Sequence, residues 1–280
     1  MSSYLRPTNL EDALHHLASV PATVIAGGTD FYPARVGRPV DEAILDISAI
    51  EELRGISTTS RHWRIGATTT WRDLLDAELP GCFDGLRAAA RQVGGQQVQN
   101  VATVAGNLCN ASPAADGVPP LLSLDAVVEI HGANGVRLLP LADFVLGNRR
   151  TALEGSDLLT AVLVPKAWEG ARGGFLKLGA RSSLVISIVM VAGTLTVDAH
   201  GSVERAALAI GACAETARRL PELEAALRGR PADGDLAGLV SPAHFQALSP
   251  IDDHRGTAAY RLDAAATLCR RLLLELASSP

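Results

Sequence analysis

Two short segments carry residue types that can bind a ligand. The first, Val24–Phe31, reads VIAGGTDF and passes from apolar β-formers to two glycines, a hydroxyl and a carboxylate. Paired glycines after a strand let backbone N–H groups turn outward and approach a ligand closely, which is the geometry of an anion site. A tight turn without any ligand explains the same Gly27-Gly28 pair. Taken alone, the segment therefore fits both interpretations.

The second segment, residues 102–116, reads ATVAGNLCNASPAAD and carries no charge before Asp116. Its small, hydroxyl and amide side chains allow the backbone to pack closely against a polar ligand. Asp116 can accept hydrogen bonds from ligand hydroxyls, as acidic residues do on a ribose. A buried loop whose side chains cap its own backbone fits the same residues equally well.

Other ligand-binding motifs are absent from the sequence. No two glycines stand at i and i+2, which excludes G-x-G-x-x-G, and the patterns G-x-x-x-x-G-K-[ST], H-E-x-x-H and G-x-S-x-G are missing as well. The histidines are dispersed. The cysteines are Cys82, Cys109, Cys213 and Cys269, without a C-x-x-C pair. We therefore expect no metal and no iron–sulfur cluster on this chain.

Composition places the chain among ordinary globular proteins. It has 280 residues, of which 48% are hydrophobic and 20% charged, enough for one large domain or two modest ones. The net charge of −5 and the 4% of aromatic residues argue against a nucleic-acid partner. The N-terminus shows no secretory signal, and the apolar stretch Leu184–Val197 is too short to span a bilayer. We expect a soluble, cytoplasmic protein.

The pattern of apolar residues predicts the elements that hold the two segments. A helix over 10–17, capped by Thr8 or Asn9, lies between short strands, which predicts a small parallel sheet. The elements expected before the polar, glycine-rich stretch 165–174 are strands 22–26, 43–47 and 62–67, helices 71–79 and 119–124, and the strand pair 126–130 with 137–139. Strands 174–180, 186–197 and 206–212 follow, and then an amphipathic helix 259–276. Strands followed by helices predict an α+β second domain.

These motifs together carry a family resemblance over the whole chain. AGGTD, followed in the second segment by TVAGNLCNASPAADGVPPLLSLDA, resembles the FAD-binding medium subunits of the xanthine dehydrogenase and carbon monoxide dehydrogenase family. Similar matches are the opening Tyr4–Leu17, residues 141–151 (LADFVLGNRRT), Phe175 with Lys177 and Arg181, and residues 250–261 (PIDDHRGTAAYR). Their order along the chain leaves little room for chance.

The resemblance implies an α+β fold, namely a two-part FAD-binding domain of the vanillyl-alcohol-oxidase (PCMH) type followed by a small α+β C-terminal domain. The expected boundaries are 1–168, with subdomains of about 1–54 and 55–168, and 169–280. Val24–Phe31 is expected to wrap the pyrophosphate, with Phe31 nearest the flavin ring. The implied cofactor-binding residues are Val24, Ile25, Ala26, Gly27, Gly28, Thr29, Asp30, Phe31, Val93, Thr103, Val104, Ala105, Gly106, Asn107, Asn110, Asp116, Leu159 and Lys177.

The resemblance also implies partners. A large subunit would hold molybdopterin and a small subunit [2Fe–2S] clusters, and electrons would cross the FAD of this chain to NAD or another acceptor. Since the flavin itself carries this redox chemistry, the resemblance implies no catalytic acid, base or nucleophile on this chain. Gln99 replaces an arginine and Val185 an aspartate of the family pattern, so the resemblance does not specify the acceptor. No cysteine-bearing insert for a further cluster is present. The rival interpretations are a stand-alone flavin oxidase and an assembly subunit that has lost FAD.

Overall fold

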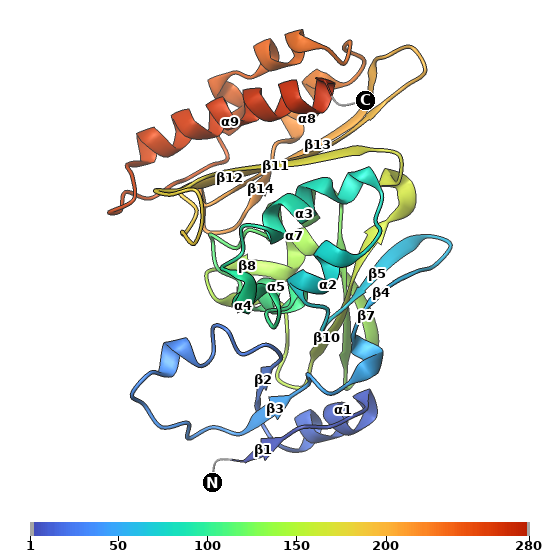
Figure 1. The fold of residues 1–280 in the computed structure, drawn as a ribbon, viewed down its shortest axis with the longest axis vertical. Coiled ribbons are helices and arrows are strands. Elements are labelled where there is room, and N and C mark those ends of the chain that lie inside the picture. Colours follow the sequence, from blue (N-terminus) through green and yellow to red (C-terminus); the bar gives the residue numbers. More distant parts are fainter. Residues whose placement is uncertain (1–2, 279–280) are drawn as a thin grey trace.

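The computed structural model describes residues 3–278, which form three parts stacked along the long axis of the molecule (Figure 1). The N-terminal part lies at one end, a middle part follows, and a sheet covered by the C-terminal helix α9 lies at the other end. The architecture is mixed helix and strand, as the sequence predicted. Within the described residues, no helix is long and apolar enough to cross a membrane.

The N-terminal part is the predicted small parallel sheet. Its elements are β1 Tyr4–Leu5, α1 Leu10–Ser19, β2 Thr23–Ile25 and β3 Ile44–Asp46, with strand order β1-β3-β2. Asn9, one of the two predicted caps, begins α1 by accepting a hydrogen bond from the Asp12 N–H. Ala13 and Leu17 of α1 pack on Leu45 of β3. The chain between β2 and β3 includes the 3₁₀ turn Pro33–Arg35 and projects as a long loop (Figure 1).

The middle part is built on an antiparallel five-stranded sheet with the order β4-β5-β10-β6-β7. The strands are β4 Ile56–Thr58, β5 His62–Gly66, β6 Val127–Gly132, β7 Gly135–Pro140 and β10 Leu158–Pro165. The helices are α2 Trp71–Asp76, α3 Asp84–Ala90, α4 Gln96–Gln99, α5 Val104–Asn110, α6 Val118–Ser123 and α7 Leu141–Phe144. The hairpin β8 Val145–Gly147 with β9 Arg150–Thr151 completes this part. Helix α2 ends before the predicted Leu79 because Pro80 follows, and a residue before proline avoids helical backbone.

The C-terminal part is a four-stranded antiparallel sheet in sequence order. Its strands are β11 Arg172–Leu178, β12 Val189–Val197, β13 Val203–Gly211 and β14 Arg218–Arg219. Helices α8 Pro221–Leu227 and α9 Ala258–Ser278 cover one face, where leucines of α9 enter the core. Strand β12 begins later than predicted because residues 186–188 connect to it, and buried Ser187 points to Asp116 instead of joining the ladder.

The second face of the C-terminal sheet packs on helices α3 and α6 of the middle part (Figure 1). Small residues allow this approach: a Cβ on Gly85 of α3 would lie 2.7 Å from the carbonyl oxygen of Gly174 in β11. Ser123 of α6 and Thr194 of β12 also share a buried hydrogen bond of 2.9 Å. The C-terminal sheet is therefore covered on both faces, on one of them by the middle part.

Candidate functional site

The predicted glycine turn, residues 27–31, follows β2, and its two glycines are required for different structural reasons. A Cβ at Gly27 would lie 2.0 Å from the carbonyl oxygen of Val101, so any side chain there would separate the turn from the second segment. Gly28 has φ +64°, a left-handed conformation that side-chain-bearing residues disfavour. The backbone N–H groups of residues 27–31 donate no hydrogen bond within the described part of the chain. Five successive free N–H groups form a concavity suited to an anion.

The second segment forms helix α5 over Val104–Asn110, and its other residues lie in turns in which side chains accept hydrogen bonds from nearby backbone, as the ligand-free alternative expected. Thr103 caps α5 by accepting a hydrogen bond of 2.9 Å from the Gly106 N–H. Its backbone is tied to the start of α2, because the Trp71 N–H donates to Ala102 and the Val104 N–H to Thr69. Val104 and Leu108 face the core, which leaves the small and amide residues of the helix to face the glycine turn.

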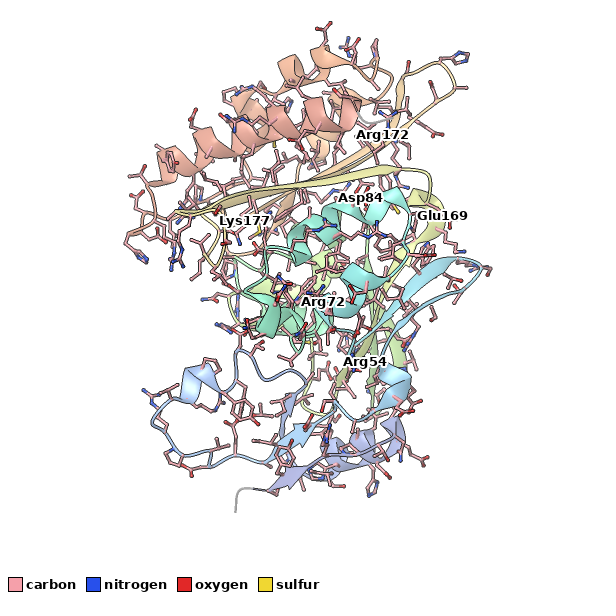
Figure 2. The ribbon with its side chains drawn as sticks, in the orientation of Figure 1. Arg54, Arg72, Asp84, Glu169, Arg172 and Lys177 are labelled. Carbon is pink, nitrogen blue, oxygen red and sulfur yellow. The ribbon has the colours of Figure 1, made fainter. Side chains whose placement is uncertain are left out.

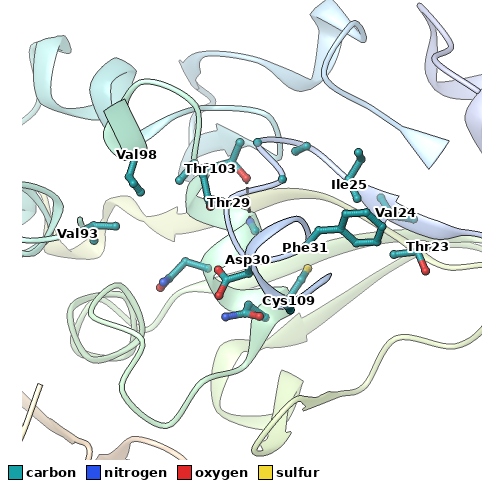
Figure 3. Close-up of a pocket in the computed structure, with 18 of the residues that line it drawn as sticks. Thr23, Val24, Ile25, Thr29, Asp30, Phe31, Val93, Val98, Thr103 and Cys109 are labelled. Carbon is teal, nitrogen blue, oxygen red and sulfur yellow. Dashed lines mark hydrogen bonds between the residues drawn. The ribbon is translucent and has the colours of Figure 1, made fainter. Parts of the chain in front are cut away.

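The glycine turn and α5 enclose a cavity of about 630 Å³ between the N-terminal and middle parts (Figure 3). In the close-up, Phe31 and Thr23 lie at one end and Val93 and Val98 at the other. The predicted residues that line this cavity are Val24, Ile25, Ala26, Gly27, Gly28, Thr29, Asp30, Phe31, Val93, Thr103, Gly106, Asn107 and Asn110. The structure thus brings both sequence segments, and Val93, to one site.

A second cavity of about 290 Å³ adjoins the first and shares Val24, Ala26, Thr103 and Gly106 with it. The predicted residues Ala105 and Leu159 line this smaller cavity. Most of its wall is apolar, with the carboxylates of Glu154 and Asp157 at its edge. The two cavities therefore meet at Val24, Ala26 and the start of α5, whereas the glycine turn lines only the larger one.

Three predicted site residues line neither cavity. Val104 lies in the core with no exposed surface. Asp116 and Lys177 pair with each other, with 2.6 Å between Oδ2 and Nζ, and the Ser187 hydroxyl donates to Asp116 Oδ1 at 2.5 Å. Burial raises the pKa of Asp116, and the opposing effects of Lys177 and Ser187 do not fully compensate. The roles of these three residues toward a cofactor stay predictions.

The cavity wall also contains residues that the sequence did not single out. Arg35 places its guanidinium carbon 3.8 Å from the centroid of the Phe31 ring and donates to the Phe31 carbonyl and to Glu42. Trp71 is fully buried, and its indole N–H has no partner among the described residues. The remaining wall residues are Thr23, Ala34, Val98, Ala102, Cys109 and Arg149. Three of these residues had a sequence signal, because Ala102 and Cys109 belong to the second segment and Arg149 to the matched stretch 141–151.

An α+β protein with a turn of free N–H groups that lines a cavity between two subdomains is suited to bind a phosphate-bearing cofactor. A model of the family described as the FAD binding domain in molybdopterin dehydrogenase matches residues 1–167, and one described as the CO dehydrogenase flavoprotein C-terminal domain matches residues 175–276. The chain belongs to this family and is an FAD-binding medium subunit of the molybdenum hydroxylase type.

Individual proteins agree over nearly the whole chain. The putative xanthine dehydrogenase FAD-binding subunit XdhB of Escherichia coli (strain K12) is 32% identical over 98% of this chain and 95% of that protein. The solved structure of quinoline 2-oxidoreductase from Pseudomonas putida 86 has a TM-score of 0.90 at 28% identity, covering 99% of this chain and 97% of that one. Carbon monoxide dehydrogenase from Hydrogenophaga pseudoflava gives a TM-score of 0.85 at 28% identity, covering 99% and 96%.

Proposed function

We propose that this chain is the electron-transfer subunit of a molybdenum-dependent hydroxylase. The chain accepts electrons at its FAD from the [2Fe–2S] clusters of a partner subunit and then passes them to NAD or another acceptor. The observation that carries this proposal is the glycine turn, whose free N–H groups line the larger of two adjoining cavities. FAD, when bound, supplies the reversible redox chemistry, and the protein supplies binding, orientation and electrostatics.

The residues present fit this cofactor. FAD consists of two ring systems joined through a pyrophosphate, and the site offers a cavity of about 630 Å³, lined by the turn, with an adjoining cavity of about 290 Å³. The free N–H groups of residues 27–31 would hold the pyrophosphate. Thr103, Asn107 and Asn110 would supply hydroxyl and amide contacts along the wall of the larger cavity.

The cavity wall supports a binding role over a catalytic one. Within the described part of the chain, no histidine, serine or glutamate lines the larger cavity. The carboxylate of Asp30, which does line it, lies 3.9 Å from the guanidinium of Arg149. A stand-alone flavin oxidase would need acid–base groups beside the reacting substrate. The proposal is therefore that substrate chemistry takes place on another subunit.

The partners and the acceptor belong to the proposal. We infer a large subunit with molybdopterin and a small subunit with [2Fe–2S] clusters, since the similar proteins are subunits or medium chains of dehydrogenases. Val185 packs over Gly179 in a loop, residues 181–186, that carries no carboxylate. The acceptor is consequently open between NAD and others, and a cytoplasmic location stays a prediction.

The test is to tag the chain in its native host, purify the complex and measure flavin, molybdenum and iron in it. We expect one FAD per chain together with both metals, and flavin bleaching on addition of the hydroxylase substrate. A chain that retains FAD but brings no metal would support the stand-alone oxidase. A colourless chain that takes up no added FAD would support the assembly subunit.

A further inference from the structure

Arg149 occupies an unusual backbone position at the tip of the β8–β9 hairpin. Its φ is +59°, in the left-handed region that a Cβ disfavours. The Arg149 N–H donates to the carbonyl of Ala111 at 2.9 Å, and Ala111, which ends α5, is itself left-handed at φ +46°. Strained backbone of this kind persists where the surrounding structure enforces it, often at binding sites. The strain here turns the Arg149 side chain toward the cavity.

The guanidinium of Arg149 has unused donors. Its Nη1 lies 3.9 Å from Oδ1 of Asp30, across the cavity, which is too long for a hydrogen bond. Within the described part of the chain, the Arg149 side chain donates no hydrogen bond at all. Arg35, the other arginine on the wall, is occupied by Glu42 and the Phe31 carbonyl. Arg149 is thus the cavity cation whose fork of five donors is free.

The charge of Asp30 makes such a cation necessary. Asp30 lies in the turn whose free N–H groups suit an anion, and its carboxylate repels any phosphate placed there. Arg149 balances that carboxylate and presents a planar fork that matches phosphate oxygens, as lysine does not. Its exposed side chain is able to leave Asp30 for a stronger acceptor.

We propose that Arg149 binds the pyrophosphate of FAD opposite the glycine turn and thereby completes the phosphate subsite. This inference rests on the proposed function, because it presupposes that the chain binds FAD. It adds a residue from the β8–β9 hairpin to a subsite otherwise made of backbone, and it couples the N-terminal part to the middle part through the ligand.

The experiment compares binding of FAD with binding of riboflavin, which has the same ring but no phosphate. Flavin is removed from the purified protein, and both ligands are titrated by fluorescence into wild type, Arg149→Gln, Arg149→Lys and Arg149→Gly. We expect Arg149→Gln to lower the affinity for FAD by roughly 10- to 100-fold, because a charge-assisted hydrogen bond is lost, while the affinity for riboflavin stays unchanged. The FAD affinity of Arg149→Lys should lie between those of wild type and Arg149→Gln.

Two controls separate the phosphate contact from a structural effect. Arg149→Gly keeps the left-handed backbone without cost, so its loss of FAD affinity reports the side chain alone. Arg150→Gln removes the neighbouring exposed arginine, which pairs with Glu215 outside the cavity, and should bind FAD as wild type does. The FAD affinity of wild type should also fall more steeply with salt than that of Arg149→Gln.

Several outcomes would overturn the inference. Equal FAD affinity in Arg149→Gln and wild type would remove Arg149 from the subsite, and equal losses for FAD and riboflavin would mark it as structural. Unchanged FAD affinity with weaker NADH binding to the FAD-loaded protein would assign Arg149 to an acceptor phosphate instead. Wild type that binds neither flavin would refute the proposed function itself, a different result from any of these.

Discussion

The ammonium of Lys177 lies 2.6 Å from Oδ2 of Asp116, and the two side chains are 4% and 9% exposed. Lys177, labelled in Figure 2, stands on β11 of the C-terminal sheet, and Asp116 lies on the connection after α5. The pair therefore spans the seam, that is, the interface between the C-terminal and middle parts. Ser187 donates to the other carboxylate oxygen. Each charge is therefore compensated only as long as the seam stays closed.

Asp116→Ala should lower the free energy of unfolding by about 3–5 kcal/mol, because it leaves the Lys177 charge buried without its partner. Urea unfolding followed by circular dichroism measures this loss. Asp84→Ala is the control, since the Asp84 side chain is 57% exposed and its partner Arg87, 2.9 Å away, keeps hydrogen bonds to the Ala77 and Leu79 carbonyls, so the loss should stay below about 1 kcal/mol. Equal losses in the two variants would show that the Lys177–Asp116 pair contributes no more than a surface ion pair.

The contact between Lys177 and Asp116 could not be predicted from the sequence alone. The glycine turn could be predicted from the sequence because Gly27 and Gly28 allow backbone conformations that other residues disfavour. The second segment could be predicted from its small, uncharged residues. The pairing of Asp116 with a lysine 61 positions away depends on the packing of two sheets, which no local pattern contains. Leu159 is similar: every residue of β10 up to Val164 is buried, so nothing in the strand distinguishes the one beside the cavity.

Gly27→Ala should abolish FAD retention, because the added Cβ would lie 2.0 Å from the Val101 carbonyl and force the turn away from α5. The measurement is the ratio of flavin to protein absorbance after purification. Gly170→Ala is the control, because a Cβ there meets nothing within 4 Å and should leave the ratio unchanged. Full flavin content in Gly27→Ala would mean that contact between the turn and the second segment is dispensable for binding.

Asp253 should contribute stability that depends on pH. The Arg255 N–H and then the Arg261 guanidinium hold the pKa of Asp253 at about 2, below its ordinary 3.8. Because the pKa of Asp253 is lower in the folded state, its ionised carboxylate stabilises the folded protein above about pH 3.8. This stabilisation is lost as the pH falls toward about 2. Asp253→Asn should therefore unfold at lower urea than wild type at neutral pH, and the difference should shrink on acidification. The exposed Asp263→Asn variant should show no such trend.

Arg35 should act on FAD binding through Phe31. The guanidinium carbon lies 3.8 Å from the Phe31 ring centroid, and Glu42 holds the guanidinium there through Nε and Nη2. Removing such a cation–π contact costs about 0.5–1 kcal/mol at an exposed site, so Arg35→Gln should weaken FAD by roughly two- to fivefold. Fluorescence titration of wild type, both single variants and the double variant with Phe31→Leu measures the coupling.

If Arg35 only positions Phe31, the loss caused by Arg35→Gln should vanish once Phe31 is already leucine, so the two losses would not add. Arg35→Lys should recover part of the affinity, because an ammonium is also attracted to the ring face, but it lacks the planar fork that binds Glu42. Arg38→Gln, an exposed arginine of the same loop, should match wild type. Additive losses would instead give Arg35 a contact with the flavin of its own, independent of the Phe31 ring.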